Sequence, residues 1–77
     1  MRKYKHLTKE EKNELKSIGE YCKIERIKNN HTRKDLSLLS GISITTLQNF
    51  EYGKTNNLLA YIAYQTNYGV NIYGKLD

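Results

Sequence analysis

A single glycine, Gly41, lies between two segments whose apolar residues recur at helical spacing. Leu36 and Leu39 precede it on one face of a short helix, and Leu47 and Phe50 follow it as a second inward-facing pair. We expect Gly41 to adopt the positive φ that a tight helix-to-helix turn requires. The stretch therefore predicts two short helices that pack against each other across a turn.

The chain has 77 residues, which make one small domain without room for a substrate-sized cleft. The single cysteine, Cys22, cannot form an internal disulfide, and we expect it to be a buried, inert thiol. No apolar run approaches the roughly 20 residues of a membrane span, and no signal peptide follows the basic opening residues. We therefore expect a cytoplasmic protein with no membrane partner.

Helix-start signals recur along the chain, and no proline interrupts it. Three capping boxes pair a hydroxyl with an acid three residues later: Thr8 with Glu11, Ser17 with Glu20, and Thr32 with Asp35. We expect an all-α bundle of about five helices, over residues 9–16, 18–29, 33–40, 44–50 and 57–67. Asn56 would cap the last helix and Gly69 would close it, and residues 70–77 would form a short strand or a loose tail. The chain then divides into a basic N-terminal extension (1–16), a helix-turn-helix domain (17–70) and a tail (71–77).

The helix after Gly41 would present an unusual outward face. Ordinary exposed helix faces are rich in Lys, Glu and Arg. Here the outward residues would be Ile44, Thr45, Gln48 and Asn49. Amide side chains can bond bidentately to adenine, and threonine or isoleucine can pack on a thymine methyl group. This face is therefore typical of a helix that reads base edges in double-stranded DNA; the alternative is an inert surface on a small bundle.

Charge is distributed unevenly along the chain. The net charge is +5, and eleven of the thirteen Lys and Arg residues fall between Arg2 and Lys34. A basic half of this kind attracts polyanions, nucleic acid first and anionic membrane second. The alternative is a solubilising surface in which glutamates alternate with lysines.

Arg26 and the segments Thr32–Ser37, Gly41–Leu47 and Phe50–Lys54 resemble the lambda-repressor-like DNA-binding domains, the Cro and Xre family of bacterial and phage transcription regulators. The resemblance covers residues 18–70. It implies a small lambda-repressor-like helix-turn-helix bundle whose second turn helix lies in the major groove. It also implies a sequence-specific regulator, a repressor of phage or mobile-element type, that binds double-stranded DNA as a homodimer in a bacterial cytoplasm.

The resemblance distributes roles among the residues near Gly41. It would place base contacts on Ile44, Thr45 and Asn49, and we add Gln48 as an outward residue of the same helix. It would place backbone contacts on Arg33, on Ser43 and on the loop from Tyr52 to Lys54, and we add Lys34 and Thr46 beside them. Arg33 also stands at a helix N-terminus, where amide groups favour a phosphate. Arg26 and Glu51 would form a structural ion pair that clamps the first helix to the end of the recognition helix.

Two further features leave alternatives open. The last helix and the tail carry four tyrosines: Tyr61, Tyr64, Tyr68 and Tyr73. They either cap a small core or form a self-association surface, and we favour the surface because tyrosine is enriched at interfaces. The N-terminal extension would either lie along DNA as a basic arm or pack Leu7 and Leu15 against the following helix.

Signals for catalysis are weak. His6 and His31 are far apart in sequence, and the glycines are scattered singly, so we expect no catalytic residue, metal, cofactor or small-molecule ligand. The competing class is a protein-binding module, such as an antitoxin or an inhibitor that reuses the helix-turn-helix fold.

Overall fold

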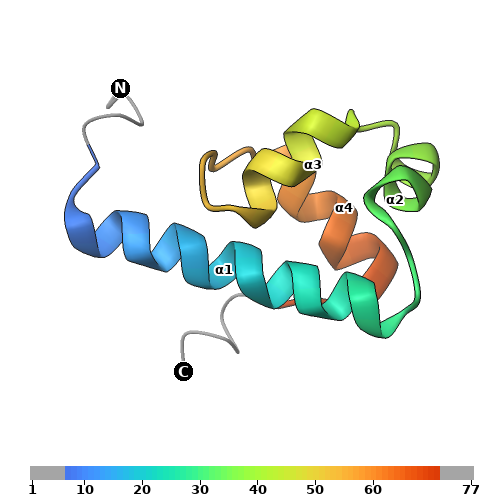
Figure 1. The fold of residues 1–77 in the computed structure, drawn as a ribbon, viewed down its shortest axis with the longest axis horizontal. Helices are drawn as coiled ribbons and strands as arrows, with labels where there is room; N and C mark the ends of the chain where they lie inside the picture. The colour runs from blue at the N-terminus through green and yellow to red at the C-terminus, as the bar shows by residue number, and fades with distance from the viewer. Residues whose placement is uncertain (1–6, 72–77) are drawn as a thin grey trace.

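A computed structural model of the chain describes residues 7–71. Over this range the chain folds into four helices: α1 (Lys9–Lys28), α2 (Arg33–Ser40), α3 (Ile44–Glu51) and α4 (Leu58–Tyr68) (Figure 1). The expected all-α fold is thus confirmed for these residues. None of the described helices is long and apolar enough to cross a membrane.

Helix α1 is one continuous helix, and our expectation of separate helices over 9–16 and 18–29 is wrong. Thr8 caps α1 through a capping box with Glu11, as expected. The second expected box, at Ser17, lies inside the helix. No proline or positive-φ residue interrupts the chain there, so the helix continues through it. The boundary expected between residues 16 and 17 therefore falls inside α1.

The turn between α2 and α3 has the predicted backbone. Thr32 caps α2 through a capping box with Asp35, and hydrogen bonds from Thr32 hold the pKa of the Asp35 carboxyl below its usual range. Gly41 ends α2 with a φ of 76°, and Ser43 caps α3. The left-handed backbone predicted for Gly41 is therefore confirmed.

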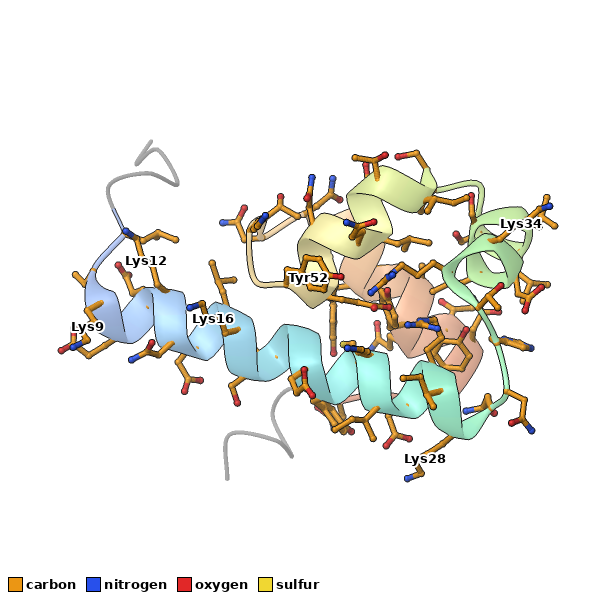
Figure 2. All side chains as sticks on the ribbon, viewed as in Figure 1. Lys9, Lys12, Lys16, Lys28, Lys34 and Tyr52 are labelled. Carbon is orange, nitrogen blue, oxygen red and sulfur yellow. The ribbon has the colours of Figure 1, made fainter. Side chains whose placement is uncertain are left out.

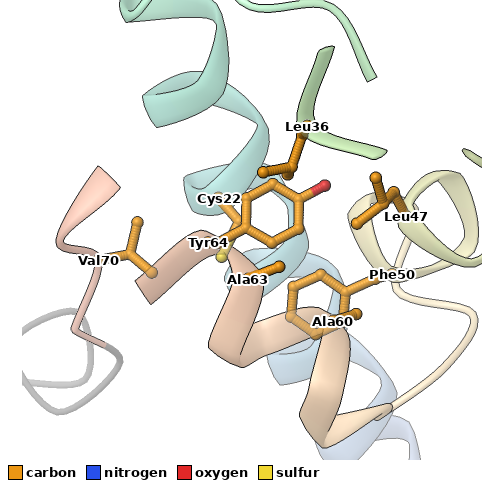
Figure 3. Close-up of a cluster of buried hydrophobic side chains, with 8 residues drawn as sticks. All are labelled: Cys22, Leu36, Leu47, Phe50, Ala60, Ala63, Tyr64 and Val70. Carbon is orange, nitrogen blue, oxygen red and sulfur yellow. The ribbon is translucent and has the colours of Figure 1, made fainter. Parts of the chain in front are cut away.

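The core lies where α1, α3 and α4 meet, with Leu36 of α2 completing it (Figure 3). Its buried side chains are Cys22, Leu36, Leu47, Phe50, Ala60, Ala63, Tyr64 and Val70. The inward positions predicted for Leu36, Leu47 and Phe50 are confirmed. Leu39 is instead 60% exposed, so its predicted inward position is wrong. Burial raises the pKa of the Cys22 thiol to about 12, as expected of an inert cysteine.

Helix α1 lies very close to the C-terminal end of α3 because two glycines leave room for the contact. Gly19 is buried in α1, and an added β-carbon there would lie 2.4 Å from the carbonyl oxygen of Phe50. An added β-carbon at Gly53, just after α3, would lie 2.7 Å from the backbone of Lys16. The N-terminal half of α1 is thus fixed to the loop that follows α3.

The last helix, α4, begins and ends one residue later than expected. Asn57, not Asn56, caps α4 by accepting a hydrogen bond from the Ala60 amide, and Gly69 closes the helix with a φ of 70°. Val70 is buried in the core, and neither it nor Asn71 forms a strand. The remainder of the expected strand or tail, residues 72–77, lies outside the described residues, as does the start of the expected basic arm, residues 1–6.

Candidate nucleic-acid interface

The outward face of α3 is exposed and carries no charge. Ile44 is 43% exposed, Thr45 and Gln48 are also exposed, and Asn49 is partly exposed. On the opposite face, Leu47 and Phe50 are buried. The structure therefore brings all four residues predicted to contact bases to one solvent-facing side of the helix.

The start of α3 is held by hydroxyl groups. The Thr46 amide donates to Ser43 Oγ at 3.1 Å, and the Ser43 hydroxyl donates to Thr46 Oγ1 at 2.9 Å. Ser43 is exposed and Thr46 is partly exposed. Both hydroxyls thus lie at the surface where the helix begins.

The end of α3 is held by a buried carboxylate, Glu51, which is bonded by all three other helices. Arg26 of α1 donates from Nε and Nη2 to the two carboxylate oxygens, at 2.7 and 3.1 Å. Arg33 of α2 donates from Nε at 3.0 Å, and the hydroxyl of Tyr64 of α4 donates a short hydrogen bond. The predicted pair of Arg26 and Glu51 is therefore part of a larger network that fixes α3 to the rest of the bundle.

This network keeps its groups charged. Burial alone would raise the pKa of Glu51, but hydrogen bonds from Arg26 and Tyr64 and the charges of both arginines outweigh it and lower that pKa. The hydrogen bond to Glu51 likewise raises the pKa of Arg26. Arg26 also donates from Nη1 to the carbonyl oxygen of His31, which ties the α1–α2 connection to the same centre.

An exposed aromatic ring, Tyr52, lies directly after α3 and close to two cations. The Arg33 guanidinium lies 5.3 Å from the centroid of the ring, and the Lys54 ammonium lies 5.8 Å from it. The Lys54 amide also donates to the carbonyl oxygen of Asn49 at 2.8 Å. The ring therefore holds two of the predicted backbone-contacting cations next to the C-terminal end of α3.

Arg33 uses one nitrogen of its guanidinium in the network around Glu51. Its Nε binds Glu51, whereas among residues 7–71 no acceptor binds its two terminal nitrogens. Arg33 and the exposed Lys34 border one shallow surface depression together with Ile44 at the start of α3. Cations thus border the outward face of α3 at both ends, with Lys34 at the start and Lys54 at the end.

Several contacts in this region were missed by sequence reasoning. Neither the bond from Tyr64 to Glu51 nor that from Arg33 to Glu51 was predicted, because partners 13 and 18 residues apart share no local pattern. His31 was not assigned a partner; its Nδ1 forms a 3.0 Å hydrogen bond with the hydroxyl of Tyr68. The available signal for the first network was the expected pairing of Arg26 with Glu51.

Within residues 7–71, no group of three or more His, Cys, Asp or Glu residues could hold a metal ion. No protein-family model matches the chain, and comparisons with curated proteins and with solved structures found no significant match.

Proposed function

We propose that this protein is a sequence-specific regulator of transcription that binds double-stranded DNA, with α2, the Gly41 turn and α3 as a lambda-repressor-like helix-turn-helix. One observation carries the proposal. The exposed face of α3 is uncharged, whereas cations border it at both ends. Duplex DNA has the matching arrangement, because base edges in the major groove are flanked by two phosphate backbones.

Base reading falls to the outward face of α3 in the major groove. Gln48 and Asn49 carry amides that can bond bidentately to adenine, and Thr45 can donate or accept a hydrogen bond. Ile44, at the start of the helix, supplies an apolar contact for a thymine methyl group. Glu51 and its partners hold this face in one orientation, so little ordering is needed when DNA binds.

Phosphate binding falls to the groups around that face. Arg33 can offer its two terminal nitrogens to a phosphate while its Nε stays on Glu51. Lys34 and Lys54 add charge at the two ends of α3. The hydroxyls of Ser43, Thr46 and Tyr52 are further donors at the surface.

We also propose that the protein acts as a homodimer on two half-sites, as a small repressor of phage or mobile-element type in a bacterial cytoplasm. Of the tyrosines that we expected at the dimer surface, Tyr64 is fully buried, Tyr61 and Tyr68 are partly buried against the core, and Tyr73 lies outside the described residues. An exposed apolar surface lies beside them and is the interface that we propose. This leucine surface is lined by Leu39, Ile42, Leu59 and Ile62.

A second copy of the chain is the partner that fits the leucine surface best. The chain carries a net charge of +5, so two copies repel each other at most faces. Residues 36–50 and 55–71, which build this surface, contain no charged residue. Two copies can therefore meet here without placing like charges together.

The proposal is tested by selecting bound sequences from a pool of random duplexes. We expect enrichment of a site with two related halves, and binding that weakens steeply as salt rises, because phosphate contacts release counterions. Failure to enrich any sequence, with weak and sequence-independent retention, would overturn sequence-specific recognition.

A protein-binding module is the second candidate, and the exposed leucines favour it. Leu38 is 78% exposed, and Leu58 and Leu59 are also largely exposed. If these residues bind another protein, a partner should be retained from a lysate with little dependence on salt, and no duplex should be enriched.

A further inference from the structure

The charged residues of the N-terminal half of α1 are segregated by sign. Lysines occur at intervals of three and four residues, which places them along one side of the helix: Lys9, Lys12 and Lys16. We call these residues the lysine row. Acids follow a second side, at Glu10, Glu11 and Glu14, and the next acid along the helix is Glu20, four residues after Lys16. An ordinary solvated helix gains stability by placing acids and bases three or four residues apart, so this segregation is not what helix stability favours.

Lys12 shows the segregation most clearly. The residues three and four positions away on either side of it are Thr8, Lys9, Leu15 and Lys16. None of them is an acid, and two of them repel Lys12. The local helix therefore leaves the charge of Lys12 unneutralised, and a polyanion outside the helix would be its natural counter-charge.

The packing of α1 directs the lysine row toward the candidate interface. Lys12 and Lys16 border a surface pocket together with Tyr52, Gly53 and Lys54. The acids lie around a different pocket, which Glu10, Glu11 and Glu14 line together with Asn56. In Figure 2, Lys12 and Lys16 lie along the side of α1 on which Tyr52 lies, whereas Lys28 points away from that side. The row thus continues the group of cations that begins with Lys54.

The position of the row is fixed. The chain after α3 approaches the backbone of Lys16 so closely that only glycine fits at position 53. Helix α1 itself runs without interruption into the buried Arg26. The row is therefore held rigidly relative to α3.

We propose that the lysine row binds the phosphate backbone of the DNA that flanks the segment read by α3. This inference rests on the proposed function and adds a second contact surface to it. The row from Lys9 to Lys16 is about 10 Å long at about 1.5 Å per helical residue. At about 3.4 Å per base pair, it spans roughly three base pairs of flanking duplex.

The test compares two variants of the full chain on two duplexes. Replacing both Lys12 and Lys16 by glutamine removes two charges while keeping a residue of similar helix propensity. Lys28→Gln is the control, since Lys28 is an exposed lysine of the same helix that pairs with Glu25 on the far side. One duplex contains only the selected site, and the other extends it by about six base pairs at each end, about twice the span of the row.

We expect the parent and Lys28→Gln to bind the longer duplex more tightly than the shorter one. The Lys12→Gln/Lys16→Gln variant should bind the two duplexes with similar affinity. The slope of log affinity against log salt should also become shallower by about 0.9 for each lost phosphate contact, or about 1.8 per protomer. Circular dichroism and the melting temperature would verify that both variants stay folded.

Two results would count against the proposal in different ways. If the double variant matches Lys28→Gln on both duplexes while the parent still binds its selected site, the lysine row does not contact DNA, and the role of α3 is unaffected. If the parent binds neither duplex, both the proposed function and this inference are overturned.

Discussion

Gly19 of α1 lies directly against the carbonyl group of Phe50 near the end of α3. An added β-carbon would lie 2.4 Å from the Phe50 oxygen and 2.5 Å from the carbonyl oxygen of Glu51. Both obstacles are backbone atoms, which cannot move aside as a flexible side chain can. The distance between α1 and α3 therefore depends on this glycine.

The first prediction concerns Gly19→Ala. At an exposed helix site the change from glycine to alanine stabilises a protein by up to about 1 kcal/mol. Here we expect the opposite sign, a loss of about 1–3 kcal/mol or more, because the methyl group forces α1 away from α3. Urea unfolding would measure the change. Asn13→Ala, at an exposed position of the same helix, is the control and should be neutral or slightly stabilising; equal stability of the two variants would contradict the close contact.

The second prediction concerns Tyr64→Phe, which removes one hydrogen bond to Glu51. We expect a loss of about 1.5–3 kcal/mol at neutral pH, the usual range for a hydrogen bond to a charged group. Tyr21→Phe, at a partly buried position beside the core, should have a smaller effect. Urea unfolding of both variants checks the difference.

The same substitution should alter the dependence of stability on pH. The pKa of Glu51 is lowered from 4.5 in the folded protein, so its contribution is present above that pH and is lost as pH falls toward the folded value. Tyr64→Phe removes one cause of the lowering. The variant should therefore lose less stability than the parent between about pH 5 and about pH 3. If the free energy of unfolding of the variant falls with pH as steeply as that of the parent, Tyr64 does not influence the titration of Glu51.

A third prediction tests whether position 41 requires glycine because of its backbone conformation or because of a lack of space for a side chain. Nothing lies within 4 Å of an added β-carbon there, but φ is 76°. Gly41→Val should cost at least about 1 kcal/mol, because a β-branched residue resists this conformation. Gly41→Asn should cost less, since asparagine adopts left-handed backbone more readily. Thermal melts of the two variants test this, and equal melting temperatures would speak against a conformational cause.

A fourth prediction distinguishes reading DNA from adhering to it. Asn49→Ala should weaken binding to the selected site by about 1–3 kcal/mol and leave binding to a scrambled duplex nearly unchanged. Lys54→Gln should weaken binding to both duplexes alike, because phosphates are present in every sequence. Titrations at one fixed salt concentration measure all four affinities. Equal losses on both duplexes for Asn49→Ala would mean that this face does not read bases.

A fifth prediction concerns self-association through the leucine surface. Leu59→Glu would place like charges opposite each other in a homodimer, so the variant should sediment as a monomer at concentrations where the parent is a dimer. Leu38→Glu, at a more exposed leucine outside that surface, should leave the dimer intact. Dissociation by both substitutions, or by neither, would place the interface elsewhere.

The elements that were predicted correctly depend on local chemistry. Thr8, Thr32 and Gly41 act through atoms within four residues of themselves, so their caps and the turn were visible in the sequence. Leu47 and Phe50 lie one helical turn apart, and their spacing alone placed them inside. The outward face of α3 follows from those two positions.

The elements that were missed depend on tertiary contacts. The box at Ser17 resembles a helix start, yet α1 runs through it and packs Gly19 against Phe50, a contact between residues 31 apart in the chain. Leu39 has the spacing of a core residue, but the bundle is too small to cover it. The hydrogen bond from the buried Tyr64 hydroxyl to Glu51 joins residues on different helices, so the spacing of residues in the sequence does not predict it.

The convergence of α1, α2 and α4 on Glu51 has a consequence for how the molecule opens. If any one of these helices detaches, the buried Glu51 carboxylate loses one of its partners, which costs about 1.5–3 kcal/mol for each hydrogen bond to a charged group. Partial opening is thus disfavoured relative to complete unfolding. Amide hydrogens in all four helices should then exchange with solvent at similar, globally limited rates, with no helix fraying as a unit of its own. The outward face of α3 would then be lost only when the whole bundle unfolds.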